Sequence, residues 1–175
     1  VFIVFLLLNQ SQNIFSKEFK LQEAINGLNS PWSLSFISND RVIATEKSGN
    51  LILIDFNIKK IKQIKHNLNI LEDGQGGLLE VLYFKDQVFV SYSEDLKRGY
   101  STTSVAKANF NENELNFQNI FRAEPPINSG YHFGSRLVIK DNLLYITAGE
   151  RGKGMIAQDP LKHPGSIIRV HLDGE

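Results

Sequence analysis

Residues 79–92 read LEVLYFKDQVFVSY, two runs rich in apolar and β-branched side chains around the polar turn 85–87. Short runs of this composition, bounded by Asn, Asp or Gly, are typical of paired β-strands. The same pattern occurs at residues 32–45, WSLSFISNDRVIAT, and at residues 136–147, RLVIKDNLLYIT. The sequence therefore predicts three copies of a strand–turn–strand unit.

The spacing of the units favours one all-β architecture. Their turn aspartates, Asp40, Asp86 and Asp141, stand 46 and 55 residues apart. A repeat of about this length is what a four-stranded β-propeller blade requires, whereas a sandwich or barrel shows turns every 8–12 residues without a longer period. We therefore predict a β-propeller, with roughly three blades in this chain. Because a propeller closes with four to eight blades, about half of the ring is expected outside this sequence.

Further strands are expected around these units, at residues 50–55, 102–110, 115–121 and 166–172. Residues 17–26 are expected to be helical or irregular. The basic run 59–66 alternates Lys with Ile, which favours a strand with one solvated face over a binding patch. His66, at the end of this run, is expected in a polar linker.

Composition excludes several classes of function. The chain carries 19 basic and 19 acidic residues in 175, so its zero net charge gives no electrostatic case for a nucleic-acid partner. The absence of cysteine excludes a disulfide framework and a thiolate metal site.

The first eight residues, VFIVFLLL, are all apolar and are followed by polar residues. As a helix they would rise only about 12 Å, too little for a bilayer, so no stable membrane span is expected. They resemble the end of a secretory signal, with a buried first strand as the alternative. We therefore expect residues 1–16 to be a signal-peptide remnant, residues 17–175 to form the propeller part, and the protein to be periplasmic or secreted.

Two glycine-rich loops are the candidates for chemistry. His132 lies between Gly130 and Gly134, and Gln75 lies in the loop 73–77. A histidine on such a loop can act as a proton acceptor, although a structural, hydrogen-bonded histidine is the open alternative. Both loops open corresponding strands, so propeller geometry is expected to bring them to one end of the channel. No metal-binding motif is present, and this chain alone is expected to hold no metal site.

Taken together, the motifs resemble the soluble glucose/sorbosone dehydrogenase family, which includes aldose sugar dehydrogenases and uses pyrroloquinoline quinone (PQQ). The matching segments, in the order of the family, are SPWSLSF (30–36), TEKSGNL (45–51), GQGGLL (74–79), HFGSRL (132–137), GERG (149–152), AQD (157–159) and HPGSIIR (163–169). The resemblance covers the chain from about residue 27 and implies the N-terminal half of a six-bladed propeller.

The resemblance also implies a reaction: the protein would oxidise a sugar hydroxyl, with hydride passing to the quinone. His132 matches the family's general base, and Gln75 matches a glutamine that faces the substrate. Tyr131 replaces the acidic residue of glucose-oxidising members, and Arg151 replaces a glutamine, so both are candidate substrate contacts for a sugar other than glucose. The quinone contacts and the Ca²⁺ ligands are expected beyond residue 175.

An external electron acceptor is the expected second partner of such an enzyme. The fragment alone is expected to be inactive, because those contacts lie beyond it. The alternative is a non-catalytic propeller that binds a carbohydrate or protein partner.

Overall fold

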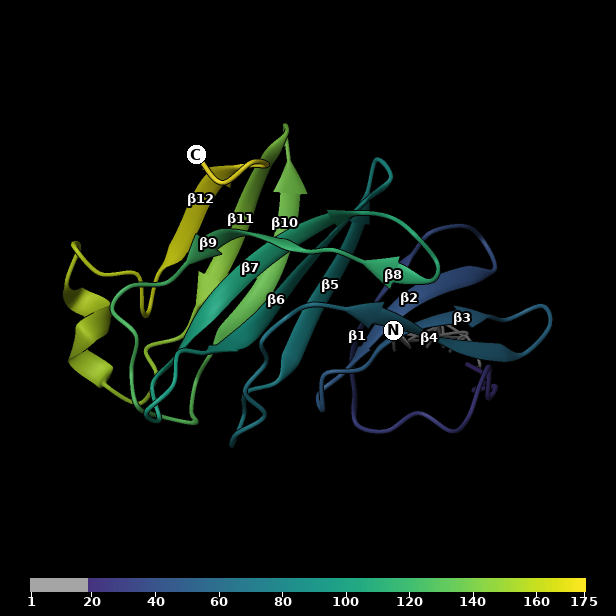
Figure 1. Cartoon of the computed structure of the whole chain (residues 1–175), viewed down its shortest axis with the longest axis horizontal. Helices are drawn as coiled ribbons and strands as arrows, with labels where there is room; N and C mark the ends of the chain where they lie inside the picture. Colours follow the sequence, from purple (N-terminus) through teal and green to yellow (C-terminus); the bar gives the residue numbers. More distant parts are fainter. Residues whose placement is uncertain (1–18) are drawn as a thin grey trace, which may run out of the picture.

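The computed structural model describes residues 19–175, which form three β-sheets arranged like neighbouring blades (Figure 1). Blade 1 contains β1 (Pro31–Phe36), β2 (Arg41–Glu46), β3 (Leu51–Asp55) and β4 (Lys60–His66). Blade 2 contains β5 (Leu78–Phe84), β6 (Gln87–Asp95), β7 (Ser101–Asn109) and β9 (Gln118–Arg122). Blade 3 contains β10 (Gly134–Lys140), β11 (Leu143–Ala148) and β12 (Ile167–His171). The strands within each blade are antiparallel, and the predicted propeller blades are confirmed.

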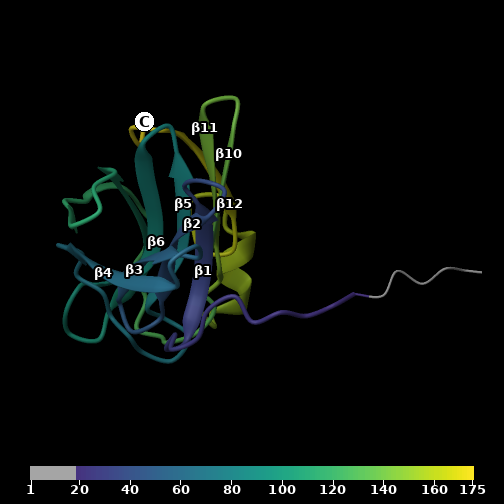
Figure 2. The ribbon, with the colours of Figure 1, turned by 90° about the vertical axis from the view of Figure 1, so that its right-hand side faces the viewer.

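The first strand of each blade forms the inner wall. β5 contacts both β1 and β10, and the turned view shows all three running in the same general direction (Figure 2). Adjacent blades therefore meet through their first strands, and the later strands of each blade lie progressively farther out. Because the inner strands share one direction, the loops that precede β5 and β10 reach the same end of the sheets.

Apolar side chains fill the space between neighbouring blades. One core joins blades 1 and 2 around Ile43, Leu51 and Val90, and a second joins blades 2 and 3 around Phe89 and Leu144. Burying a side chain of this size contributes about 1.5–3 kcal/mol. Blade packing, rather than strand pairing alone, therefore holds the three sheets together.

The outer side of blade 1 is covered by the segment that precedes β1. Val42 and Ile54 on this side pack against Ile25 and Leu28 from the segment before β1. This segment has no regular secondary structure over its described part, so the irregular alternative expected for residues 17–26 is the one observed there. The proposed signal remnant, residues 1–16, lies outside the described residues.

Blade 2 also contains a buried polar cluster around Glu94. Arg122 donates to both carboxylate oxygens of Glu94, over 2.7 and 2.9 Å, and Ser104 donates over 2.6 Å. Burial by itself would raise the pKa of Glu94, but the bonds from Arg122, Ser104 and Asn119 lower it overall. The cluster therefore joins β6, β7 and β9 with a carboxylate that is charged in the folded state.

The observed strands differ from the predicted ones in three places. His66 is the last residue of β4 and not part of a linker, because its Nε2 lies 2.7 Å from the carbonyl oxygen of Gly49 and the strand continues to this point. The strand expected at residues 115–121 is divided into β8 (Glu114–Leu115), which pairs in parallel with β4, and β9. A short 3₁₀ helix, η1 (Gly154–Gln158), was not predicted. No helix within residues 19–175 is long and apolar enough to cross a membrane.

Candidate functional site

The two glycine-rich loops meet at the lower end of the blades in Figure 1, as predicted. The backbone N–H of Gln75 donates to the carbonyl of Gly130 over 2.7 Å. In return, the Gln75 side-chain Oε1 accepts a hydrogen bond of 2.9 Å from the backbone N–H of His132. Gln75 therefore fixes the position of the histidine backbone from the neighbouring blade.

His132 projects from this junction with its side chain about half exposed, at 51%. Its φ of +49° lies in the left-handed region, which non-glycine residues rarely adopt. Backbone of this kind is held by its surroundings and is frequent at functional sites. The conformation turns the imidazole out of the sheet while Phe133, next in sequence, is buried.

A carboxylate from the neighbouring turn completes the pair. Glu150, which follows β11, contacts Nδ1 of His132 through its Oε1, and this hydrogen bond lowers the pKa of Glu150. The backbone N–H of Gly152 donates to the same oxygen over 3.0 Å. A carboxylate at Nδ1 places the ring proton on that nitrogen and leaves Nε2 as the proton acceptor. The arrangement therefore suits a general base.

Two glycines permit these loops to approach closely. A Cβ added to Gly149 would lie 1.9 Å from the carbonyl oxygen of His132, and one added to Gly74 would lie 2.5 Å from that of Gly130. Such contacts are far inside van der Waals distance, so no other residue fits at either position without backbone movement.

Arg151 lies beneath the loop and is only 2% exposed. Its guanidinium donates to the carbonyls of Tyr131 and Ser101 over 2.9 and 3.0 Å, and it also contacts the carbonyl of Ser129. It stacks on Phe133, with 3.6 Å from its Cζ to the ring centroid. Burial lowers its pKa to about 10, which still leaves it charged at neutral pH. These contacts hold the 129–133 loop in place, and a direct contact from Arg151 to a sugar stays a prediction.

The remaining candidate, Tyr131, is 60% exposed beside the histidine, with 6.2 Å between the two ring centroids. The structure thus brings Gln75, Tyr131 and His132 to one surface and places Arg151 under it. Glu150 was missing from the predicted site residues. The charged turn GERG at 149–152 was the available signal, but the sequence does not show that its carboxylate reaches Nδ1.

Among residues 19–175, no three His, Cys, Asp or Glu side chains lie together as a possible metal site. Expected Ca²⁺ ligands beyond residue 175 stay a prediction.

Comparison with known proteins adds independent information. Residues 28–175 match the sequence profile of the family described as Glucose / Sorbosone dehydrogenase. The chain is similar to aldose sugar dehydrogenase YliI of Escherichia coli strain K12, with 30% identity over 158 residues that cover 85% of this chain and 43% of that protein.

Solved structures agree with this match. The chain is similar to a glucose dehydrogenase, with 30% identity and a TM-score of 0.82 over 87% of this chain and 47% of the other. It is also similar to the soluble aldose sugar dehydrogenase of Escherichia coli in the apo-form, with 28% identity and a TM-score of 0.83 over 88% and 47% of the two chains. The PQQ-bound aldose sugar dehydrogenase of Streptomyces coelicolor, 21% identical, shares the fold at a TM-score of 0.78. The chain spans about half the length of these relatives.

Proposed function

Because the chain belongs to the glucose/sorbosone dehydrogenase family, we propose that it is the N-terminal part of a PQQ-dependent enzyme that oxidises a sugar hydroxyl. The relatives named as aldose sugar and glucose dehydrogenases support the substrate class, and the Streptomyces coelicolor relative is described as PQQ-bound. The observation that carries the proposal is the His132–Glu150 pair on an exposed loop at one end of the blades.

In this proposal His132 is the general base. Nε2 accepts the proton of the sugar hydroxyl that is being oxidised, and the Glu150 carboxylate stabilises the resulting imidazolium through Nδ1–H. Bound PQQ would supply the acceptor for the hydride that leaves the sugar carbon. Gln75 contributes by holding the His132 backbone from blade 2, and we propose that it also contacts the substrate.

An acidic cofactor needs cationic partners, and two cations that contact the glycine-rich loops are already engaged. The guanidinium of Arg151 is buried in its bonds to the 129–133 loop and to Ser101, and the ammonium of Lys47 donates to the carbonyl of Gly74 over 2.7 Å. We therefore place the quinone contacts and the Ca²⁺ ligands in the part of the protein beyond residue 175. Tyr131 is the proposed sugar contact, and Arg151 supports the loop that carries it. We further propose that the protein is periplasmic or secreted.

The test uses the longest natural form of the protein, reconstituted with PQQ and Ca²⁺, with dye reduction measured across a panel of sugars. His132→Ala should lower kcat by about 10²–10⁴-fold, the usual contribution of a general base. Glu150→Gln should lower kcat by at least about tenfold with little change in KM, because it acts through the imidazole. His171→Ala, which changes an exposed histidine on β12, is the matched control and should leave both parameters unchanged.

Turnover of no sugar, or full activity of His132→Ala, would refute this function. If a carbohydrate binds the reconstituted protein but no sugar is oxidised, the alternative of a non-catalytic binding propeller is correct.

A further inference from the structure

The face of blade 2 that packs against blade 3 changes in character along its length. Its apolar part, with Phe89 on β6 and Val105 on β7, belongs to the core between the two blades. Because side chains alternate along a strand, the same face continues toward the glycine-rich loops with Ser91 and Ser93 on β6 and with Thr103 on β7. These three hydroxyl residues are at most 1% exposed. A buried hydroxyl is almost always hydrogen-bonded, so each one holds a group that the fold brings to this face.

Ser93 holds both ends of the loop that carries Gln75. Its Oγ accepts a hydrogen bond of 2.6 Å from the backbone N–H of Gly77 and donates to the carbonyl of Leu71 over 2.5 Å. The main chain of Ser93 repeats the same links, because its carbonyl accepts from the N–H of Leu71 at 2.9 Å and its N–H donates to the carbonyl of Gly77 at 3.0 Å. The two ends of the loop 71–77 are therefore closed on a single buried residue.

Thr103 holds the loop that carries His132. Its Oγ1 donates to the carbonyl of Phe133, the residue after the histidine, over 2.7 Å. The same carbonyl accepts a second hydrogen bond, of 3.1 Å, from the backbone N–H of Gly149 in the turn after β11. A carbonyl oxygen has two lone pairs, so these two bonds satisfy it fully. Gly149 belongs to blade 3, and Thr103 is therefore the group that ties this carbonyl to blade 2.

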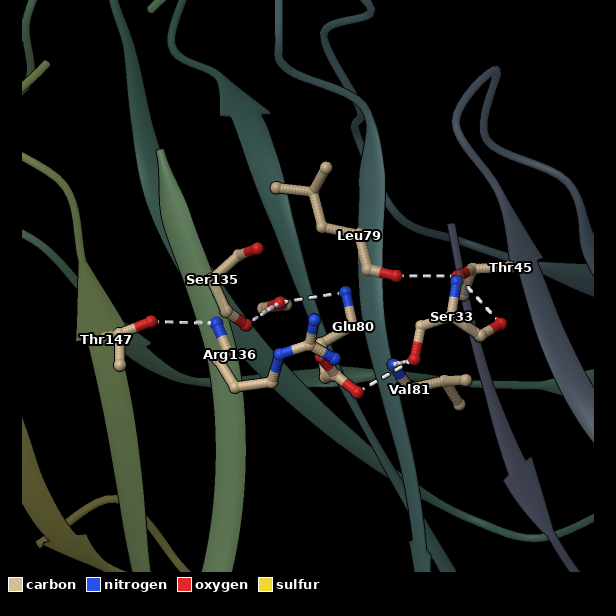
Figure 3. A network of polar contacts seen from close by, with 9 residues as sticks. Ser33, Thr45, Leu79, Glu80, Val81, Ser135, Arg136 and Thr147 are labelled. Carbon is tan, nitrogen blue, oxygen red and sulfur yellow. Dashed lines mark hydrogen bonds and ion pairs between the residues drawn. The ribbon is translucent and has the colours of Figure 1, made fainter. Parts of the chain in front are cut away.

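The chain at the start of β10 needs such anchors because its backbone is unusual. His132 and Ser135 have φ values of +49° and +88°, and such conformations persist in non-glycine residues only where the surroundings enforce them. Ser91 Oγ donates to the carbonyl of Ser135 over 2.6 Å. On the other side of β10, the backbone N–H of Arg136 donates to Thr147 Oγ1 over 2.9 Å (Figure 3). Hydroxyls of blades 2 and 3 thus hold the path of the chain that leads from the histidine into the strand.

One cross-strand pair of blade 2 therefore serves both loops of the candidate site. Ser93 and Thr103 are directly opposite each other in the pairing of β6 with β7, and side chains in such a pair are neighbours on one face of the sheet. Ser93 fixes the loop of Gln75, and Thr103 fixes the loop of His132. The two loops are joined in turn, because the Gln75 side chain accepts the hydrogen bond from the N–H of His132 at 2.9 Å. The backbone of His132 is thus held from blade 2 on both sides of its Cα atom.

We propose that Thr103 is a positioning residue for the general base, and that its hydroxyl keeps the imidazole of His132 in the orientation that proton transfer requires. This inference rests on the proposed function of His132, and it assigns a role to a buried residue outside both loops. Gln75 holds the N–H of His132, and Thr103 holds the carbonyl of the next residue. Without the Thr103 hydroxyl the loop keeps only one of these two links to blade 2. A displacement of about 1 Å at a reacting group can lower the rate by about 10²-fold.

The test compares variants of the longest natural form of the protein, reconstituted with PQQ and Ca²⁺. Thr103→Val removes the hydroxyl and keeps the branched shape of the side chain, and it should lower kcat by about 10- to 100-fold. KM should change little, because the lost interaction orients the base and does not bind the sugar. Thr103→Ser keeps a hydroxyl at this position and should restore most of the lost activity. If Thr103→Val does not fold, Thr103→Ala removes the same hydroxyl without adding a methyl group.

Thr102→Val is the matched control. Thr102 is the neighbouring residue on β7, is 2% exposed, and points to the opposite face of the sheet. Its hydroxyl also donates to a backbone carbonyl, that of Ala123 directly after β9. The control variant should lower the melting temperature about as much as Thr103→Val, since each change removes one buried hydrogen bond. It should leave kcat unchanged, because its partner does not hold the histidine.

Amide hydrogen exchange provides a measurement that does not depend on activity. The N–H of His132 bonds the Gln75 side chain, and the N–H of Arg151 bonds the carbonyl of His132 at 3.3 Å. Exchange of these two amides should rise in Thr103→Val and not in Thr102→Val, while the amides of β6 and β7 stay protected. Wild-type kcat in Thr103→Val, or an equal loss of kcat in the two valine variants, would overturn the proposal. If the wild type oxidises no sugar, the proposed function itself fails, and the exchange rates alone decide whether Thr103 holds the loop.

Discussion

Replacing Ser91 with Ala should destabilise the junction of blades 2 and 3 more than the loss of one oxygen atom suggests. Ser91 is fully buried, and its hydroxyl bonds two backbone groups, the N–H of Glu80 at 3.1 Å and the carbonyl of Ser135 at 2.6 Å. Both partners are on residues less than a tenth exposed. The substitution leaves these two backbone groups without a partner, and each such group costs about 1–3 kcal/mol.

The substitution also removes the free-energy cost of burying a hydroxyl, which offsets part of this loss. We therefore expect the free energy of unfolding to fall by about 2–3 kcal/mol. In a domain of this size the melting temperature should then fall by about 4–12 °C. Urea unfolding followed by circular dichroism measures the difference in the free energy of unfolding.

Ser38→Ala is the matched control, since Ser38 is exposed in the turn after β1. Its effect should stay within about 0.5 kcal/mol. If Ser91→Ala cost no more than Ser38→Ala, the conclusion that the Ser91 hydroxyl joins blades 2 and 3 would be wrong.

Three further predictions concern the core, the buried carboxylate and the loop. Phe89→Ala, which empties a fully buried site between blades 2 and 3, should cost about 3–5 kcal/mol in the same unfolding measurement. Glu94 has a lowered pKa, so its stabilising contribution is present above the ordinary value of 4.5 and is lost as the pH falls through the folded value. Arg122→Ala should therefore flatten the loss of stability in acid, and an unchanged pH profile would contradict this. Arg151→Ala removes a buried guanidinium that bonds two carbonyls of the 129–133 loop and the carbonyl of Ser101 in β7, and amide hydrogen exchange should rise in residues 129–133 while the β5–β6 hairpin stays protected.

Strand positions were predictable because alternating apolar residues and polar turns act over a few neighbours. The hairpin at residues 79–92 and its two repeats were confirmed as β5–β6, β1–β2 and β10–β11, with ends that differ by one to three residues. The linker expected at His66 was wrong, because Lys65 and His66 pair with β8, about fifty residues later in the chain, and this pairing extends β4. The residue pattern within one short segment cannot predict a pairing with a strand that is distant in sequence.

The candidate site, too, was predicted only in part from the sequence. The two glycine loops could be placed at one end of the blades, since repeated units put equivalent loops at equivalent positions. Glu150 could not be assigned to His132, although both lie in conspicuous motifs, because their contact depends on the path of the turn after β11. Arg151 was a candidate substrate contact, and the sequence did not show that the fold buries it under the 129–133 loop.

Local chemistry along the chain thus established the all-β class, the blade period and the histidine loop, since each depends on residue type and short spacing. Contacts between residues that are far apart in sequence were determined by the packing of the sheets. Ser33, Glu80 and Arg136 are more than forty residues from one another and carry no shared motif, yet the twist and stacking of three sheets place them in one hydrogen-bonded row. The physical reason is that strand register decides which residues of different blades meet, and this register becomes defined only when the sheets pack.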